Sequence, residues 1–494
     1  MITGTLLILP WLAGLLAFAL RPAGLRRALL VGTALAHLGL TGALWCRRPS
    51  VGGTGWFGPD GPGLLFLGIT SGLFLAASVY ALGYLAREAR VTHRDFEEGF
   101  LFRNEPEGVF VGCLLCFLGA MTLVCLSRDL GLLWVAVEAT TLASAPLICF
   151  HRHHRSLEAT WKYLLVCSVG IALALLGNFF LGMAAARAGS NGQPVPLSLD
   201  AMLVAAPGLQ MPWLKAAFIL LLIGYGTKMG LAPMHTWLPD AHSESPSVVS
   251  ALLSGAVLNC AFLAILRAYQ VCAAAGQGEF ARELLILFGL LSMGVAAVFI
   301  LGQTDYKRLL AYSSVEHMGI LALGVGLGGA GAFGSAWHAI NHSLTKAALF
   351  LVAGNILTVY QTKAIHDVRG VSHALPWTGA LWTAGLLAIT GTPPFGSFHS
   401  ELLVLKAALD GHQGWIAGLY LALLGLIFVG MATAFLRMAQ GRAPGALEVQ
   451  RLQHLGLAQA PPAVLLLLVL VLGLHLPEGL RLWLQEVAHA WGGA

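Results

Sequence analysis

The sequence predicts an all-α integral membrane protein with about fourteen transmembrane helices, and three observations carry this prediction. Hydrophobic residues make up 57% of the 494 residues and charged residues only 10%, against about 25% charged residues in an average soluble domain. The mean hydropathy is +0.78, and long apolar stretches recur along nearly the whole chain. Sixty glycines fit the close helix contacts of membrane proteins. These properties exclude a soluble enzyme, a nucleic-acid-binding protein and a disordered scaffold.

Windows of about 20 apolar residues, bounded by charges or by Gly and Pro clusters, define the fourteen spans. The first, Leu6 to Leu20, has no basic residue ahead of it and no small-residue cleavage site, so we expect a span rather than a signal peptide. The segment from Pro477 to Trp491 mixes charged and aromatic residues, which favours an amphipathic surface helix over a fifteenth span. The fourteen spans centre near Gly14, Ala36, Leu75, Phe117, Thr140, Ala172, Leu222, Val257, Leu291, Leu321, Leu349, Leu387, Leu424 and Leu468.

The distribution of basic residues predicts the orientation in the membrane. Of the 28 Lys and Arg residues, 16 fall in loops after odd-numbered spans and 8 in loops or ends on the other side. We therefore expect both termini on the non-cytoplasmic side of a bacterial inner membrane.

The eight cysteines predict neither a disulfide framework nor a bound cofactor. Most lie inside apolar runs, where a cysteine behaves as a small hydrophobic residue. Cys113 and Cys116 form a single C-x-x-C with no second pair, which is a weak metal signal. No phosphate-binding, dinucleotide-binding or hydrolase motif is present. We expect no cofactor, no metal and no catalytic site in this chain.

Ionisable residues inside the apolar segments are the main functional signal. Each costs about 2.5–3.5 kcal/mol at the centre of a span, and such residues are usually functional. Lys162 and Lys406 lie near span ends, from which they could extend to the interface. Glu138, Lys228 and Lys346 lie too deep for that, so we interpret them as functional. The full set is Glu138, Lys162, Lys228, Lys346, Glu401 and Lys406.

Two proline-containing stretches predict interrupted helices. Lys228 lies in IGYGTKMGLAPMHTWLPDAH, and Glu401 lies in AITGTPPFGSFHSELLVLK. Prolines remove backbone hydrogen bonds, which is tolerated in a span only where protein or water satisfies the freed groups. The helix-breaking prolines are Pro233, Pro239, Pro393 and Pro394.

The two interrupted stretches also align with each other at a constant offset of 161 residues. Two broken segments at matching positions are typical of an internal repeat. The aligned pairs are Gly230 with Gly391, Pro233 with Pro394, Trp237 with Phe398, and Asp240 with Glu401.

A third pattern, WHAINHSLTKAALFLVAGN, places His338, His342 and Lys346 at i, i+4 and i+8 on one helix face. The Cα atoms of successive members of this set are about 6 Å apart, so their long side chains, with one water in each gap, could form a proton wire. The alternative is that the histidines are hydrogen-bonded to neighbouring backbone. Glu316 and His317 are interpreted as polar contacts between helices, and the HRHHR run from His151 as a solvated loop rather than a metal site.

At these residues the sequence resembles the antiporter-like membrane subunits of respiratory complex I, of Mrp cation/proton antiporters and of membrane-bound NiFe hydrogenases. The matching stretches are VEATTLASA, EATWKYLL, GTKMGLAPMHTWLPDAHSESPSVVSALL, TDYKRLLAYSSVEHMG and NHSLTKAALFLVAGN. They cover roughly residues 105–410, and the variants EATTLAS and YSSVEHMG look most like the hydrogenase-4 component F type.

The resemblance implies two inverted five-helix repeats, each with one broken helix and one proton half-channel, joined by a polar axis. The implied segments are helices 1–3 in residues 1–104, one repeat in each of 105–272 and 273–440, and a last helix with an amphipathic tail in 441–494. One departure is that some relatives place the central lysine on the eighth helix, where this sequence has Asn259.

The resemblance also assigns roles to individual residues. Glu138 and Lys228 form the ion pair of the first half-channel, and Glu401 ends the second. Lys346 with His342 forms the central relay. The secondary positions are Lys162 and His338 on the connecting path and His242 as a gate.

The resulting hypothesis is a proton-translocating subunit of a multi-subunit redox-driven complex, with other membrane and peripheral subunits and lipid as partners. The alternatives are a subunit of a Mrp-type sodium/proton antiporter and a structural scaffold subunit. Protons are the expected transported ions, and sodium is the second ion in the antiporter alternative.

Overall fold

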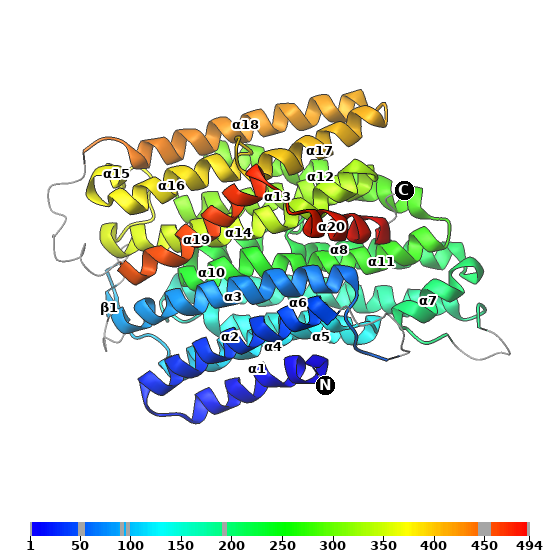
Figure 1. Ribbon diagram of the computed structural model, residues 1–494, viewed down its shortest axis with the longest axis horizontal. Helices are drawn as coiled ribbons and strands as arrows, with labels where there is room; N and C mark the ends of the chain where they lie inside the picture. Colours follow the sequence, from blue (N-terminus) through cyan, green and yellow to red (C-terminus); the bar gives the residue numbers. More distant parts are fainter. Residues whose placement is uncertain are drawn as a thin grey trace.

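The computed structural model describes residues 2–47, 55–88, 93–94, 99–189, 195–442 and 456–491. Within these residues the chain is a bundle of long helices lying side by side, with one small antiparallel sheet of β1 (His93–Arg94) and β2 (Leu101–Phe102) (Figure 1). Twelve segments are long and apolar enough to cross a membrane. This confirms the prediction of a polytopic all-α membrane protein.

The twelve uninterrupted spans follow the predicted order. One of them joins α10 (Ser247–Leu252), a π-helical turn η3 (Leu253–Val257) and α11 (Leu258–Ala274). The other eleven are α1 (Ile2–Ala19), α2 (Ala23–Arg47), α3 (Gly61–Arg87), α4 (Glu107–Leu126), α5 (Leu130–Ile148), α6 (His154–Ala185), α12 (Gly278–Leu301), α13 (Tyr306–Leu327), α14 (Ala330–Tyr360), α18 (Gly414–Ala439) and α19 (Gly456–Leu474).

Two further segments are interrupted helices, as the proline-containing stretches predict. The first consists of α8 (Met211–Met229) and α9 (Trp237–Glu244), and the second of α16 (Pro376–Ile389) and α17 (Gly396–Asp410). Whether these two segments also cross the membrane, which would give the predicted fourteen crossings, stays a prediction. The inverted relation between the repeats and the segment boundaries at 104, 272 and 440 remain predictions.

The two interruptions have the same backbone signature at the predicted offset. Gly230 and Gly391 both have positive φ, 83° and 58°, which glycine adopts without steric cost. Pro233 and Pro394 each follow a cis peptide bond. One detail of the prediction is wrong: Pro239 does not break a helix. It lies in the first turn of α9, where the backbone N–H that proline lacks would have no partner within the helix.

Aspartate residues cap the N-termini of several spans. Asp60, Asp129 and Asp305 accept hydrogen bonds from backbone N–H groups in the first turns of α3, α5 and α13. Such N-caps satisfy donors that a helix leaves open. The short helices are α7 (Leu199–Ala205), η2 (Ala206–Gly208), α15 (Val371–Ala374) and α20 (Glu478–Ala490).

The segment predicted to be an amphipathic surface helix is α20. Its apolar face, with Trp483, Leu484 and Val487, is buried against α3 and α14, while Glu478 and Arg481 form an exposed ion pair. At 13 residues it is too short to cross a membrane. Its position at the membrane surface stays a prediction.

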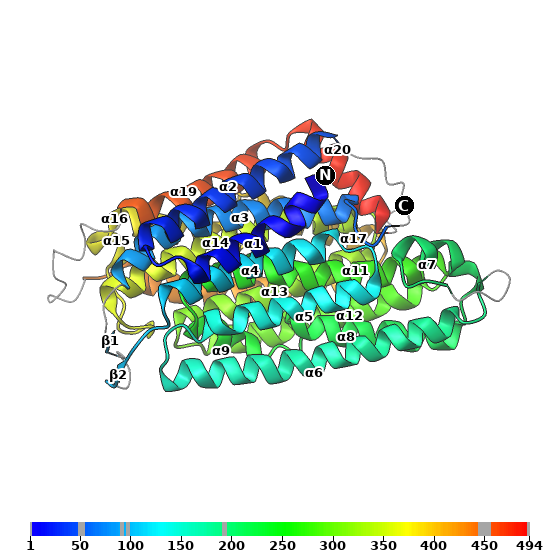
Figure 2. The ribbon, with the colours of Figure 1, turned by 90° about the horizontal axis from the view of Figure 1, so that it is seen from below.

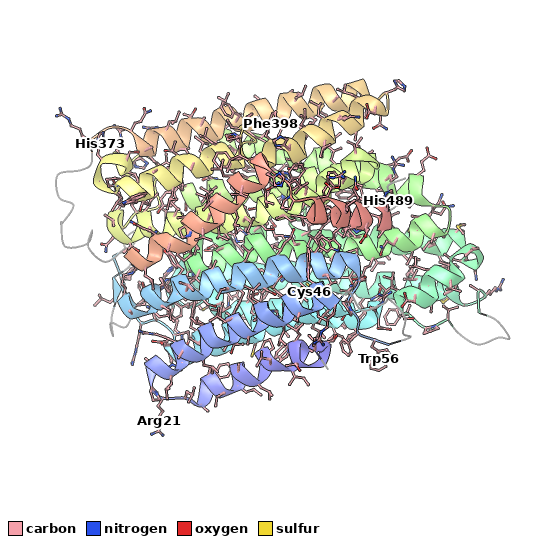
Figure 3. All side chains as sticks on the ribbon, in the orientation of Figure 1. Arg21, Cys46, Trp56, His373, Phe398 and His489 are labelled. Atoms are coloured by element: carbon pink, nitrogen blue, oxygen red, sulfur yellow. The ribbon has the colours of Figure 1, made fainter. Side chains whose placement is uncertain are left out.

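The most buried spans are α13 and the span that ends with α11, followed equally by α4 and α14. Figure 2 shows α13 and α14 in the middle of the bundle, with α6 along one edge and α2 and α19 along the opposite edge. Exposed Arg21 and His373 lie at one end of the bundle and exposed Trp56 at the other, where basic and aromatic residues suit a membrane–water interface (Figure 3). Polar groups on the central helices therefore face protein rather than lipid.

Candidate functional site

Lys228 lies at the end of α8, immediately before the first interruption, and its side chain is buried. Its Nζ donates to Thr141 Oγ1 at 2.9 Å and to the Tyr163 hydroxyl at 2.5 Å. The Tyr163 hydroxyl in turn is 2.6 Å from Ser144 Oγ. The last turn of a helix carries partial negative charge, so this position suits an ammonium group. Lys228 is thus a buried cation held by hydroxyl groups.

Glu138 does not form the direct ion pair with Lys228 that the resemblance implies, since no contact within 4.0 Å joins them in the described structure. Glu138 is half-buried on α5, and its Oε1 accepts a hydrogen bond from Ser168 at 3.2 Å. Thr141, one turn further along α5, accepts a hydrogen bond from Lys228 instead. Glu138 and Lys228 therefore have separate hydrogen-bond partners, Ser168 and Thr141. Whether Glu138 acts in proton transfer stays a prediction.

Lys162 lies on the exposed face of α6 and belongs to a surface network. Its Nζ is 2.7 Å from Glu158 and 3.0 Å from Asp240, and Asp240 also pairs with Arg308 at 2.7 Å. The network connects α6, α9 and the start of α13. The structure does not bring Lys162 into contact with the buried lysines, and its role on the connecting path stays a prediction.

His242, the predicted gate, is fully buried in α9, and neither ring nitrogen makes a hydrogen bond within the described structure. Its ring centroid is 5.3 Å from the Phe350 ring and 6.2 Å from the Trp237 ring. An imidazole without a partner in an apolar setting is available to a transient donor or acceptor.

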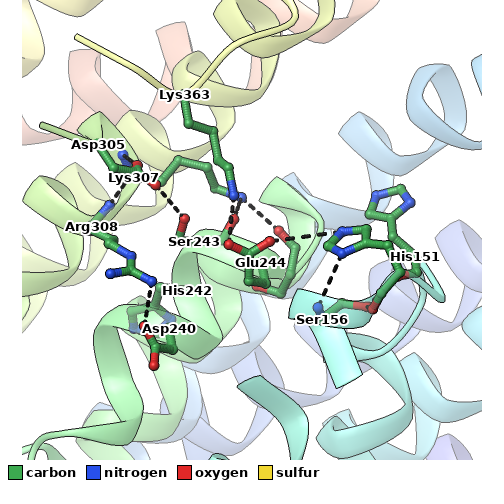
Figure 4. A network of polar contacts seen from close by, with 12 residues as sticks. His151, Ser156, Asp240, His242, Ser243, Glu244, Asp305, Lys307, Arg308 and Lys363 are labelled. Atoms are coloured by element: carbon green, nitrogen blue, oxygen red, sulfur yellow. Dashed lines mark hydrogen bonds and ion pairs between the residues drawn. The ribbon is translucent and has the colours of Figure 1, made fainter. Parts of the chain in front are cut away.

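A cluster of charged residues surrounds the end of α9 beyond His242 (Figure 4). Lys307 Nζ donates to the carbonyls of Ser243 at 2.9 Å and Ser245 at 2.7 Å, which have no partners within the helix. Lys363 Nζ lies 2.7 Å from Glu244 in a buried ion pair. The sequence interpretation did not single out these residues. The charges of Lys307 and Glu244 at the ends of apolar runs are the only sequence signal that could have found them.

Lys346 is fully buried on α14. Its Nζ donates to the Leu310 carbonyl at 2.6 Å and to Ser313 Oγ, both on α13, and no carboxylate among the described residues lies within 4.0 Å of it. A buried ammonium without a carboxylate partner is costly, so its proton responds strongly to charges nearby. This agrees with the interpretation of Lys346 as more than a structural residue.

The predicted histidines are buried below Lys346, and His338 is bonded to side chains rather than to the backbone. His338 Nε2 is 2.9 Å from His317 Nδ1, and its Nδ1 is 2.9 Å from Ser400 Oγ. The His342 ring centroid is 5.0 Å from that of His317. His338 thereby joins α13, α14 and α17. The alternative of histidines bonded to the backbone does not hold for His338, because both of its ring nitrogens contact side chains.

Glu401, on α17 directly after Ser400, completes this cluster. One of its carboxylate oxygens and one ring nitrogen each of His317 and His338 all lie within 4.8 Å of one another. These three could bring ligands to a metal ion, but the sequence predicts no metal. The nitrogen–nitrogen and nitrogen–hydroxyl contacts that are present are those of proton donors and acceptors.

His317 makes a polar contact between helices, as the sequence interpretation predicts. On α13, Ser313 contacts Lys346 and His317 contacts His338, so the buried Glu316 lies on the same face between the two contacts. Glu316 is a carboxylate inside an apolar span, and the rule applied to Glu138 would have found it.

Asn259 lies where some relatives have a lysine. It is buried next to the π-helical turn η3, and its Nδ2 donates to the Gly255 carbonyl at 3.0 Å and to Ser343 Oγ at 2.6 Å. Such π turns often occur at functional positions. An amide group does not exchange a proton at accessible pH, so Asn259 cannot replace that lysine. Of the lysines on the central helices α11, α13 and α14, Lys307 is bonded to the end of α9, which leaves Lys346.

The bundle with two interrupted helices and a central line of buried charges defines an antiporter-like membrane subunit. Residues 127–427 match the family described as NADH:quinone oxidoreductase/Mrp antiporter, transmembrane. A hydrogenase-4 component F homolog of Methylacidiphilum infernorum is 36% identical over 379 residues, 76% of this chain and 78% of the relative. The chain belongs to this family, as the sequence resemblance predicts.

Solved structures share the fold over the whole chain. A chain of the Mrp complex from Dietzia sp. DQ12-45-1b superposes with a TM-score of 0.81 at 20% identity, covering 100% of this chain and 97% of that chain. A chain of respiratory complex I from Thermus thermophilus gives a TM-score of 0.79 at 24% identity and covers 100% of both chains. At these identities the likeness concerns the fold.

Proposed function

We propose that this chain translocates protons as one membrane subunit of a multi-subunit, redox-driven complex in a bacterial inner membrane, with both termini on the non-cytoplasmic side. The observation that carries the proposal is the buried cluster of His317, His338 and Glu401 beside Lys346. Burying these groups together in a membrane span is costly. Proton transfer gives such a cluster a use.

The central steps follow from the contacts. Lys346 donates a proton to His342, one turn away on α14, through one bridging water. His342 passes a proton to His317, whose ring centroid is 5.0 Å away. His317 and His338 share a hydrogen bond of 2.9 Å, and His338 delivers a proton to the nearby Glu401 carboxylate. Each group that gives up a proton receives one from the group before it, and an imidazole suits this relay because one ring nitrogen can accept a proton while the other donates one.

The first region, around Lys228 and the first interruption, supplies protons through hydroxyl groups. Ser144, Tyr163 and Lys228 form a continuous hydrogen-bonded series on α5, α6 and α8. A hydroxyl both donates and accepts, so a proton can enter such a series at one end and leave at the other. His242, unpartnered and buried on α9, is the proposed gate between Lys228 and the central helices.

Partner subunits must provide the driving force. Moving one proton against 100 mV requires about 2.3 kcal/mol, and we propose that this chain holds no redox cofactor to supply it. The hydrogenase-4 homolog and the complex I likeness support a redox complex as the setting. The purified chain is therefore expected to show no redox activity and no stoichiometric flavin, quinone or metal. A bound redox group in its optical spectrum or metal analysis contradicts this part.

A second candidate function, a subunit of a Mrp-type sodium/proton antiporter, is favoured by the likeness to the Dietzia chain. Proton movement that requires sodium and no redox substrate supports this alternative. A scaffold role, in which the buried charges only connect helices, predicts instead that neutral replacements leave transport unchanged.

Lys346→Met in the assembled complex is the decisive test. Methionine keeps a similar length and an apolar stem, so packing is preserved while the relay is cut, and proton pumping into inverted vesicles should fall more than about tenfold. Lys346→Arg should fail nearly as badly, because guanidinium does not release its proton. The control is Lys406→Met, since Lys406 is exposed and paired only with Asp410. Normal pumping by Lys346→Met would show that Lys346 is structural.

A further inference from the structure

A groove on the outer surface runs between α12 and α18, away from the buried cluster. Leu287, Leu291 and Val298 of α12 and Leu419 and Leu423 of α18 line it. Leu287, Val298 and Leu419 are 59%, 70% and 41% exposed, so large apolar side chains face whatever surrounds the bundle at this place. The groove therefore lies on the outer surface of the bundle.

The walls of the groove favour a hydrocarbon chain over a helix as its occupant. From Glu283 to Val298 it extends about 22 Å, at 1.5 Å per helical residue. Its walls are mainly large apolar side chains rather than the small residues that let helices approach closely. A hydrocarbon chain fits along such walls.

The polar atoms of the groove gather at one end, near the starts of both helices. Glu283 lies there with an exposed carboxylate, and its neighbour Arg282 donates to the carbonyls of Gly326 and Leu327 instead of pairing with it. Gln413, just before α18, contributes a buried Oε1 that has no hydrogen-bond partner within the described structure. Two unpaired acceptors at this end favour a cationic group with N–H donors.

We propose that this groove, the α12–α18 groove, binds a phospholipid with a primary-amine head group, its ammonium between Glu283 and Gln413 and one acyl chain along α12. The apolar part from Ile286 to Val298 is about 18 Å long, close to the roughly 15 Å that one leaflet contributes to a 30 Å hydrocarbon core. The proposal does not depend on proton transfer by the buried cluster.

Filling the groove tests where the lipid binds. A Cβ at Gly294 meets no atom within 4 Å, so Gly294→Phe fills the groove without disturbing the fold. The control is Gly425→Phe, because Gly425 is equally open but lies on the opposite face of α18. Native mass spectrometry of the purified complex with ethanolamine lipid should show retention reduced at least about tenfold by Gly294→Phe only. Equal retention in both variants overturns the proposal.

Varying the head group tests the polar end. Ethanolamine lipid should bind more tightly than choline lipid, which has the same charge but no N–H donor, and glycerol lipid should bind least. Glu283→Gln should abolish this preference, whereas Glu279→Gln, an exposed carboxylate outside the groove, should keep it. A preference for glycerol lipid, or a photo-crosslinker at position 294 that captures only a partner protein, overturns the proposal.

Discussion

The first interrupted helix carries its charge before the break, and the second carries its charge after it. Lys228 lies in the last turn of α8, whereas Glu401 lies in the second turn of α17. Helix C-termini favour cations and N-termini favour anions, so each charge lies in the half-helix that suits its sign. At the offset of 161 residues, Lys228 corresponds to the apolar Ile389, and Glu401 to the surface residue Asp240. Two breaks with one backbone signature therefore present opposite charges.

The partners of the two charges differ in the same systematic way. Lys228 is held by the hydroxyls of Thr141 and Tyr163, while Glu401 lies against the imidazoles of His317 and His338. A hydroxyl group passes a proton on by accepting one and donating another, whereas an imidazole can also carry the added proton itself. The comparison teaches that the region around Lys228 is suited to relaying protons through hydroxyls, and the region around Glu401 to relaying them through imidazoles.

The largest expected difference in proton pumping is between variants of the two corresponding carboxylates, Glu401 at the second break and Asp240 at the first. Glu401→Gln removes the end of the buried chain while keeping its shape, so proton pumping should fall more than about tenfold. Asp240→Asn should cause a much smaller loss, because Asp240 pairs with exposed Lys162 and Arg308. Pumping rates in vesicles, normalised to assembled complex, measure both. Equal losses would remove the functional difference between the two breaks.

A smaller effect is expected at Glu138. Glu138 makes no direct contact with Lys228 in the described structure, so Glu138→Gln should reduce pumping several-fold and leave assembly intact. Tyr163→Phe, which removes a direct hydrogen bond to Lys228 but keeps the ring 4.5 Å away, should reduce it more. Wild-type pumping by Glu138→Gln would exclude that carboxylate from the path.

The breaks are also secured differently, which predicts different stability effects. At the first, the Ala232 N–H donates to Ser292 Oγ at 2.9 Å, and Ser292→Ala should lower the free energy of unfolding by about 1 kcal/mol. At the second, Gly473 of α19 is so close that an added Cβ would lie 2.0 Å from the Pro394 carbonyl oxygen. Gly473→Ala should therefore cost about 1–3 kcal/mol. Thermal unfolding of the solubilised protein checks the order, and a less stable Ser292→Ala variant would reverse it.

Much of this architecture could be predicted from the sequence because lipid imposes simple constraints. Apolar length located the spans, and proline and glycine located both breaks, since few backbone conformations are tolerated at membrane depth. Buried charges such as Lys228 and Lys346 were visible as exceptions within apolar runs. These signals depend on residues that are neighbours in the sequence, so they do not depend on how the helices pack.

The contacts between helices were not predictable in this way. The separation of Glu138 from Lys228 depends on where α5 and α6 place Thr141 and Tyr163. The approach of His317 to His338 depends on how α13 packs against α14. Pro239 was misjudged because its effect depends on whether it falls in a first helical turn, and the start of α9 was not evident. Tertiary packing, rather than composition, decides each of these cases.

The smallest expected effect concerns Lys162, which the family resemblance places on the connecting path and the structure places in a surface network. Lys162→Met removes its contacts with Glu158 and Asp240, but Asp240 keeps Arg308 at 2.7 Å. Exposed ion pairs contribute about 0–1 kcal/mol, so pumping should change less than about twofold. The matched variant is Lys228→Met, whose buried ammonium has no substitute and whose loss should reach that of Glu401→Gln. If Lys162→Met stops pumping as completely as Lys228→Met, protons pass through the exposed face of α6, and the first region transfers protons at its surface as well as at Lys228.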